Sequence, residues 1–262
     1  MTEEQNFSAP SVDPEDLQKQ VLDLRRQLAE AQARNRAMWN LLAEISQRLQ
    51  ASSTSIKAAV SSLLDYDIFW DGSTQHEFLE TIDDSVEQGA SLILLMTLAF
   101  RSEASRLEIK PEPHTLQEIL STVLDTIALK TPGHPFKADF PPEGQPVWVD
   151  YGYLAVALRL LLEVMIEPGT TFAQIELLAV ETQDCWWLNI APIAEPISAG
   201  INHIDQDRFD ELVAIDNLSP ENVLKLFTAA RILRLQNIRL DVETDEASNV
   251  RLRLRIPVVT PS

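Results

Sequence analysis

The sequence predicts an α+β protein: a long helical hairpin with a coiled coil that forms a dimeric four-helix bundle, followed by a two-layer α/β sandwich. Apolar residues recur with a seven-residue period from Leu17 to Leu63, and a second apolar helix follows after a short polar stretch. Beyond residue 106, strand-like runs alternate with apolar helical segments. We therefore expect a disordered lead-in (1–14), a coiled coil and dimerisation hairpin (15–105) and an α/β domain (106–262).

Composition narrows the function classes. Apolar residues make up 45% of the 262 residues, enough for a core, and the net charge is −19. Such a surface repels phosphate backbones and anionic lipids, so we expect no nucleic-acid partner; the alternative is that the acidity serves solubility alone. The single cysteine, Cys185, excludes a disulfide within the chain. The sequence has neither a signal-peptide pattern nor an apolar run long enough for membrane insertion, which predicts a cytoplasmic protein.

The first helix carries the coiled-coil pattern. It starts at Pro14 and should end near Asp65, and all its heptad a and d positions are apolar except Asn35 and Ser52. An Asn at one a position can fix a parallel, two-stranded register, or it can be a tolerated defect. The expected dimer interface comprises Val21, Leu24, Leu28, Asn35, Met38, Leu42, Ile45, Leu49 and Ile56.

A second helix should fold back on the first. Residues 67–73 contain a Gly and polar residues and are predicted to form a loop, and Thr74 with Glu77 fits a capping box. The helix should run from about Gln75 to Ser105, with one apolar stripe. Its expected members are Phe78, Ile82, Val86 or Ser85, Gly89, Leu92, Ile93, Met96 and Phe100.

The remaining chain is predicted to alternate strands and helices. We expect His114 or Thr115 to cap the helix that follows, and the last two strands to form a hairpin because their residues alternate. The expected strands are 107–110, 136–140, 146–149, 172–181, 186–191, 239–243 and 249–258, and the expected helices are 116–130, 153–166, a short one within 207–215, and 220–235.

This order of elements resembles the core of the sensor histidine kinases. Residues 42–49 with 54–57 resemble that family's phosphoacceptor helix, and residues 106–113 resemble its junction with the ATPase domain. Val149-Asp150 resembles the entry to the first nucleotide-binding helix, and residues 231–240 match its last helix-to-strand step. The resemblance covers residues 37–258 and implies a dimerisation hairpin joined to a histidine-kinase-type ATPase domain.

The residues that the resemblance assigns to phosphoryl transfer are altered. Gln47 stands at the phosphoacceptor position, where the family has a histidine with an unshared ring nitrogen. An amide nitrogen is conjugated with its carbonyl and cannot take that role. Arg48 replaces the neighbouring acid, and Ser52 replaces the helix-bending proline.

The residues that the resemblance assigns to ATP are altered as well. Leu160 and Val164 replace two asparagines, the second a magnesium ligand, and neither side chain offers the oxygen that magnesium requires. The adenine-binding Asp-x-Gly-x-Gly matches Pro192, Ala194 and Pro196. The phosphate loop matches residues 223–226, including Val223 and Lys225, and no glycine follows Gly200. We therefore expect no cofactor, and the scattered histidines predict no metal site.

The resemblance and its departures together predict a non-enzymatic signalling scaffold. This degenerate kinase, or pseudokinase, would be a homodimer that binds a response-regulator receiver domain or a related histidine kinase in a two-component system. The family's receiver-docking surface corresponds to Gln47, Arg48, Gln50 and Ala51. Three alternatives stay open: a phosphorelay phosphotransferase using His76, a divergent but active sensor kinase, and a purely structural coiled-coil protein.

Overall fold

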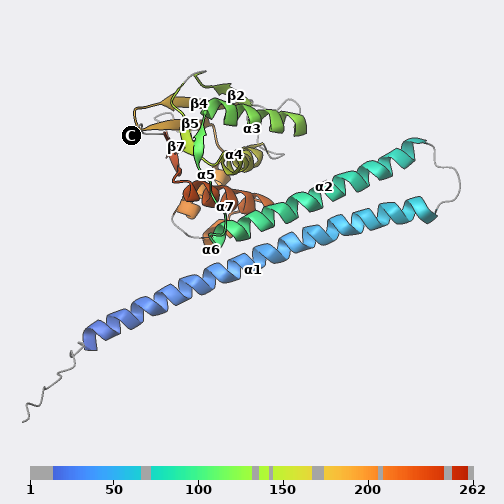
Figure 1. Ribbon diagram of the computed structural model, residues 1–262. Coiled ribbons are helices and arrows are strands. Elements are labelled where there is room, and N and C mark those ends of the chain that lie inside the picture. The colour runs from blue at the N-terminus through green and yellow to red at the C-terminus, as the bar shows by residue number, and fades with distance from the viewer. Residues whose placement is uncertain are drawn as a thin grey trace, which may run out of the picture.

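The computed structural model describes residues 14–65, 72–131, 136–141, 144–166, 174–205, 209–244 and 250–258. Its first half is a hairpin of two long helices, α1 (Pro14–Asp65) and α2 (Gly72–Glu103), which lie side by side in Figure 1. The predicted end of the first helix is confirmed. The predicted capping box is wrong, because α2 already begins at Gly72 and Thr74 lies within it. The disordered lead-in and most of the predicted loop fall outside the described residues.

The hairpin is held together by a narrow apolar seam. Leu41 and Ile45 of α1 and Leu92 of α2 are almost fully buried. Farther along the hairpin, the Ser52 hydroxyl donates a hydrogen bond to the Ser85 carbonyl oxygen. The seam therefore combines aliphatic packing with a buried polar contact between small residues, which satisfies the hydroxyl that burial would otherwise leave without a partner.

The apolar residues of α2 form two stripes instead of the single stripe that we expected. Ser85, Leu92, Leu95 and Ala99 are buried against the rest of the chain. A second stripe repeats every seven residues and is about half exposed. Its members are Leu79 (51% exposed), Val86 (51%), Ile93 (58%) and Phe100 (46%).

The second half of the chain is a sheet covered by helices. Two expectations are corrected here: residues 107–110 form no strand, and an additional helix, α5, follows the fifth strand. The elements are β1 (Glu112–His114), α3 (Leu116–Lys130), β2 (Phe136–Asp139), β3 (Val147–Val149), α4 (Tyr151–Met165), β4 (Ile175–Glu181), β5 (Cys185–Ala191), α5 (Glu195–Asp205), α6 (Phe209–Val213), α7 (Pro220–Leu235), β6 (Arg239–Thr244) and β7 (Val250–Pro257).

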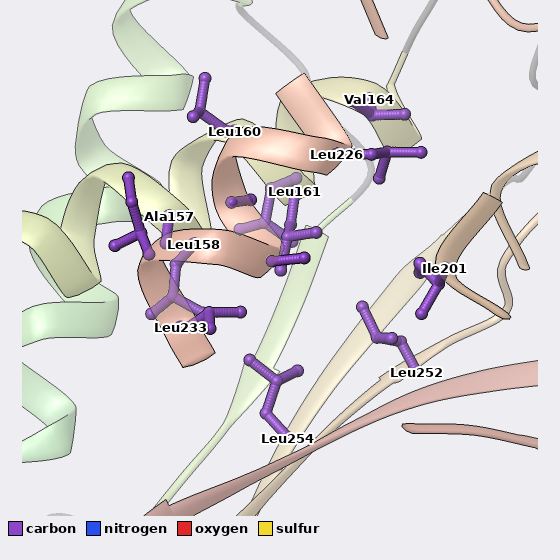
Figure 2. Packing of buried hydrophobic residues seen from close by; sticks show 14 of the residues in the cluster. Ala157, Leu158, Leu160, Leu161, Val164, Ile201, Leu226, Leu233, Leu252 and Leu254 are labelled. Carbon is purple, nitrogen blue, oxygen red and sulfur yellow. The ribbon is translucent and has the colours of Figure 1, made fainter. Parts of the chain in front are cut away.

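The main sheet is mixed and has the order β2-β4-β5-β7-β6, while β1 and β3 form a separate antiparallel pair. The predicted closing hairpin is confirmed, since β6 and β7 pair antiparallel with Leu240 opposite Leu254. Alternate residues of β7, including Leu252 and Leu254, enter the core beneath α4, α5 and α7 (Figure 2). These layers confirm the predicted α+β fold class.

Helix boundaries follow local capping signals. The predicted cap at Thr115 is confirmed, since its side chain accepts a hydrogen bond from the Glu118 N–H at the start of α3. Ser219 caps α7 in the same way, with Pro220 at the first helical position. Asn237, at a φ of 59°, follows the end of α7 and allows the chain to turn into β6.

The α/β part packs on the end of the hairpin at which α2 finishes (Figure 1). Helix α7 packs against α2 and α6 packs against α1. The Glu103 carboxylate joins the two parts, because one oxygen lies 2.7 Å from Arg34 of α1 and the other lies 2.6 Å from Arg231 of α7. Within the described ranges, no helix is both long and apolar enough to cross a bilayer.

Candidate functional site

The candidate site begins at Asp150, the residue that caps α4. One carboxylate oxygen accepts a hydrogen bond from the Tyr153 N–H at 3.1 Å, and the other accepts from the Lys110 N–H at 2.9 Å. The Asp150 N–H in turn donates to the side-chain oxygen of Gln236, just past α7, at 2.7 Å. Asp150 therefore fixes the start of α4 to the inter-domain junction and to the end of α7.

Helix α4 presents carbon atoms at both positions where the resemblance predicts nucleotide chemistry. Leu160 is 4% exposed and Val164 is 1% exposed. Val164 lies beside Leu226 of α7 (Figure 2), and Leu160 lies with Leu92 and Leu95 of α2. These positions do not fit a magnesium ion, because burial in an apolar layer supplies no oxygen ligand.

The segment after β5 runs directly into a helix. Pro192 and Ala194 are partly buried, and the Ala194 carbonyl oxygen accepts hydrogen bonds from the N–H groups of Ile197 and Ser198 at 3.1 Å. Pro196 lies in the first turn of α5, where a missing N–H costs no helical hydrogen bond. The backbone of this segment therefore forms the hydrogen bonds of the first turn of α5.

The segment matched to the phosphate loop is likewise helical. Residues 223–226 lie inside α7, and Val223, Leu224 and Leu226 are at most 2% exposed. Their N–H groups lie within the helix, so a loop conformation that presents several N–H groups to a phosphate is absent from this segment.

Lys225 is the charged member of that segment, and it binds two carboxylates. Its Nζ atom lies 2.9 Å from an oxygen of Glu221 and 3.2 Å from an oxygen of Glu163. Burial by itself would lower the pKa of Lys225, but Glu163 and Glu221 outweigh it and raise that pKa above its ordinary value. Lys225 is therefore held in its charged form.

The same carboxylates extend the charge network to both sides. Arg48 of α1 lies 3.4 Å from Glu221, and Arg159 of α4 lies 3.7 Å from Glu163. We call these five residues the α4–α7 charge network: Arg48, Glu221, Lys225, Glu163 and Arg159. Its charges alternate in sign, and it links the phosphoacceptor-like helix to the two helices that correspond to the nucleotide site.

A cavity of about 850 Å³ lies beside this network, between α2 and the helices α3, α4 and α7. Its α/β wall is formed largely by the network itself, with Arg159, Glu163, Glu221 and Lys225. Its α2 wall carries the acidic residues Asp84 and Glu87. Because both cations of the α/β wall are already paired with carboxylates, this cavity offers little positive charge to a polyphosphate. Among the described residues, no group of three or more His, Cys, Asp or Glu converges as a metal site would require.

The predicted partner-binding residues lie on α1, level with the start of α7, where Arg48 contacts Glu221. Gln47, Gln50 and Ala51 are exposed, as a docking surface requires. Arg48 differs, because its side chain is 40% exposed and pairs with Glu221. On α2, His76 is exposed and its Nε2 atom lies 3.1 Å from a carboxylate oxygen of Glu80.

The predicted dimer-interface residues divide into three groups within one chain. Val21, Leu24, Leu28 and Asn35 are exposed. Met38, Leu42, Leu49 and Ile56 are half-buried, while Ile45 is completely buried in the seam with α2. The single stripe expected on α2 included Val86, Ile93 and Phe100, but the structure leaves these three exposed together with Leu79, and their seven-residue spacing was a readable signal of a separate stripe.

No protein-family model matches the sequence, and no curated protein is similar to it by sequence. The structure does resemble solved histidine kinases. The Acinetobacter baumannii histidine kinase AdeS aligns at 15% identity over 81% of this chain and 98% of its own, with a TM-score of 0.56. Full-length ShkA in complex with AMPPNP aligns at 13% identity over 85% of this chain, with a TM-score of 0.56, and this chain spans 46% of its length.

A third similar structure is that of the histidine kinase ThkA in complex with the response regulator protein TrrA. It aligns at 16% identity over 90% of this chain and 67% of its own, with a TM-score of 0.54. At these identities the likeness is one of fold. The chain therefore has the fold of a histidine kinase core, as its sequence resemblance predicted.

Proposed function

We propose that this chain is a non-catalytic scaffold of two-component signalling, a homodimer that binds a response-regulator receiver domain or a related histidine kinase. The fold supports the signalling class, and ThkA carries the same fold in a complex with a response regulator. One fold can host many activities, so the residues of the site decide the function.

The Lys225–Glu163 ion pair is the main observation in favour of a non-catalytic protein. It lies beside Leu160 and Val164, so the region that would handle magnesium and phosphate consists of aliphatic side chains and of charges that neutralise one another. A nucleotide would have to break these pairs and leave half-buried carboxylates next to its own phosphates, which is unfavourable. Loss of ATP chemistry with retention of the scaffold is the simplest account of this arrangement.

The exposed residues Gln47, Gln50 and Ala51 are the proposed docking surface for the partner. Arg48 lies within the same patch and contacts Glu221 at the start of α7. A partner bound there would therefore touch the α/β part through Arg48 as well as the hairpin. This arrangement would make binding sensitive to how the two parts are placed.

Two exposed apolar stripes support the homodimer. The α2 stripe repeats every seven residues, and the first heptads of α1 (Leu17, Val21, Leu24 and Leu28) are also about half exposed. Contiguous exposed apolar residues are typical of protein interfaces, and heptad spacing favours a second helix as the partner. The cytoplasmic location stays a prediction.

Nucleotide binding and autophosphorylation test the catalytic part of the proposal. We expect no heat of binding when the purified protein is titrated with AMPPNP and magnesium, and no label retained after incubation with radiolabelled ATP. ShkA, whose structure contains AMPPNP, is the positive control for the titration. Micromolar binding or retained label would overturn the proposal in favour of a divergent active kinase.

A second assay addresses the partner. The receiver domains of the host are immobilised one at a time, and we expect at least one to bind the wild-type protein. Binding should weaken in Gln47→Lys and Ala51→Arg variants and persist in Leu129→Arg, which changes an exposed residue of α3. The phosphotransferase alternative predicts instead that phosphorylated regulator passes its label to this protein, and that His76→Ala abolishes the transfer.

A further inference from the structure

The strand β6 forms one edge of the main sheet. It pairs with β7 on one side and is the last strand in the order β2-β4-β5-β7-β6. An edge strand presents backbone N–H and C=O groups that another strand can pair with. This edge of the sheet can therefore serve as a template for an added peptide strand.

A cavity of about 520 Å³ runs beside this edge. Its apolar wall is formed by Ile201 and Ile204 of α5, Ala230 of α7, and Ile238 and Leu240 at the start of β6. Four of these five side chains are at most 8% exposed, so they are fixed by the core behind them. The cavity is large enough for an apolar side chain from a strand placed along β6.

Two exposed arginines, Arg234 and Arg239, stand at the rim of this cavity. Arg234 donates a hydrogen bond to the Ile204 carbonyl oxygen at 3.5 Å, and neither arginine pairs with a carboxylate of the described residues. Other arginines of the chain do have such a partner, although they compete for the same 40 acidic residues. Those with a carboxylate within 4 Å include Arg34, Arg48, Arg159, Arg231 and Arg253.

Arg239 also faces a like charge within the sheet. It lies directly opposite Arg255 of β7, and like charges in opposite positions destabilise a sheet. The neighbouring Arg253 does have partners within the chain, since it pairs with Glu243 and lies over the ring of Trp187. Asp241 lines the cavity and lies opposite Arg253. An external carboxylate at Arg239 would offset a repulsion that the described residues leave in place.

We propose that β6 binds an extended acidic segment of a partner protein as an added strand. One apolar side chain of that segment enters the cavity, and its carboxylates pair with Arg234 and Arg239. Only a peptide can supply the backbone groups that an edge strand pairs with. Binding of a peptide at β6 is independent of the proposed loss of ATP chemistry.

The probe is a fluorescent octapeptide of alternating glutamate and valine, measured by fluorescence anisotropy with the full-length protein. We expect binding that weakens about tenfold in Arg239→Gln and in Arg234→Gln, the loss of one charge-assisted contact. Arg106→Gln, which changes an exposed arginine outside this edge, should bind as the wild type does. A peptide with glutamine in place of glutamate, or with proline in place of the central valine, should bind less tightly, because one lacks the charge and the other a backbone N–H.

Hydrogen exchange locates the bound peptide. Amides of residues 239–244 should become protected on binding, while those of β2, at the opposite edge of the sheet, should not. The proposal is overturned if no peptide binds at about 1 mM, if both arginine variants bind like the wild type, or if protection appears at β2. Binding to phosphatidylglycerol vesicles that is lost in the same arginine variants would also overturn it, in favour of a membrane surface.

Discussion

Lys225 and Glu163, which are 62 positions apart in sequence, form an ion pair of 3.2 Å between α7 and α4. Each occupies, or directly adjoins, a position that the family resemblance assigns to nucleotide chemistry. Their side chains are 17% and 21% exposed, so water screens the pair only in part. We therefore expect this ion pair to stabilise the fold at the position that corresponds to the nucleotide site of a kinase.

Replacing Lys225 by Met should destabilise the protein by about 1–3 kcal/mol, because Glu163 and Glu221 lose their shared cation while half-buried. Urea unfolding followed by circular dichroism measures the change. Lys57→Met, at an exposed position of α1, is the matched control and should change stability by less than about 0.5 kcal/mol. Adding Glu163→Gln to Lys225→Met should recover part of the loss. Equal stability of the Lys225→Met and Lys57→Met variants would show that Lys225 does not stabilise the fold through these two carboxylates.

The same lysine predicts a pH dependence. The folded pKa of Lys225 is raised, so its contribution is fully present below the unfolded-state lysine pKa of about 10.4 and is lost as pH rises through the higher folded value. The stability difference between the wild type and Lys225→Met should thus be constant near neutral pH and shrink above about pH 10.4. Urea titrations across that range measure it. A stability difference between the two proteins that increased with pH would contradict a raised pKa of Lys225 in the folded state.

Leu160→Asn and Val164→Asn restore the residue type that the resemblance expects, yet they should not restore nucleotide binding. Each buries an amide among aliphatic side chains and should cost about 2–4 kcal/mol. Thermal unfolding and AMPPNP titration are the measurements, with Leu160→Met as the volume-matched control. Tight AMPPNP binding by the doubly substituted protein would mean that the site needs only these two amides.

Glu103→Gln removes the carboxylate that Arg34 and Arg231 share. The contact between the hairpin and the α/β part should weaken by about 1 kcal/mol. Hydrogen exchange should then accelerate at the end of α2 and in α6, while the sheet keeps its protection. Glu108→Gln, at an exposed position of the junction, serves as the control. Unchanged exchange in the Glu103 variant would show that apolar packing alone fixes the two parts.

Ile93→Arg should convert the proposed dimer to a monomer without unfolding it, because Ile93 is 58% exposed within one chain. Sedimentation velocity gives the oligomeric state and circular dichroism the helix content. Leu129→Arg changes a more exposed residue, 85%, outside the stripe and should leave the dimer intact. A wild-type protein that sediments as a monomer would remove the basis of the homodimer proposal.

Much of the fold was predictable because its signals are local. The bounds of α7 follow from Ser219, Pro220 and the change of period after Leu235. The alternation in β7 follows from three arginines that alternate with the buried residues Leu252, Leu254 and Ile256. Where local signals misled, tertiary contacts decided the outcome. Residues 107–110 alternate like a strand, but Leu107 is buried and the Lys110 N–H bonds to Asp150, while the pairing with β3 falls on Glu112, Pro113 and His114.

The positions of the candidate site could be predicted from the sequence, but the contacts of its side chains could not. The resemblance located Leu160, Val164 and Lys225, but it gave no indication that Glu163 and Glu221 would neutralise the lysine. The Arg48–Glu221 contact joins residues 173 positions apart, and no periodicity encodes such a pair. Helix α5 was overlooked because Pro192, Pro196 and Gly200 break the apolar pattern, although a proline in the first turn is compatible with a helix.

The shared carboxylate of Glu103 has a mechanical consequence. Arg34 belongs to α1 and Arg231 to α7 of the α/β part, and both form an ion pair with the Glu103 carboxylate at the end of α2. A displacement of α1 at Arg34 would therefore act on Glu103 and, through Arg231, on the α/β part.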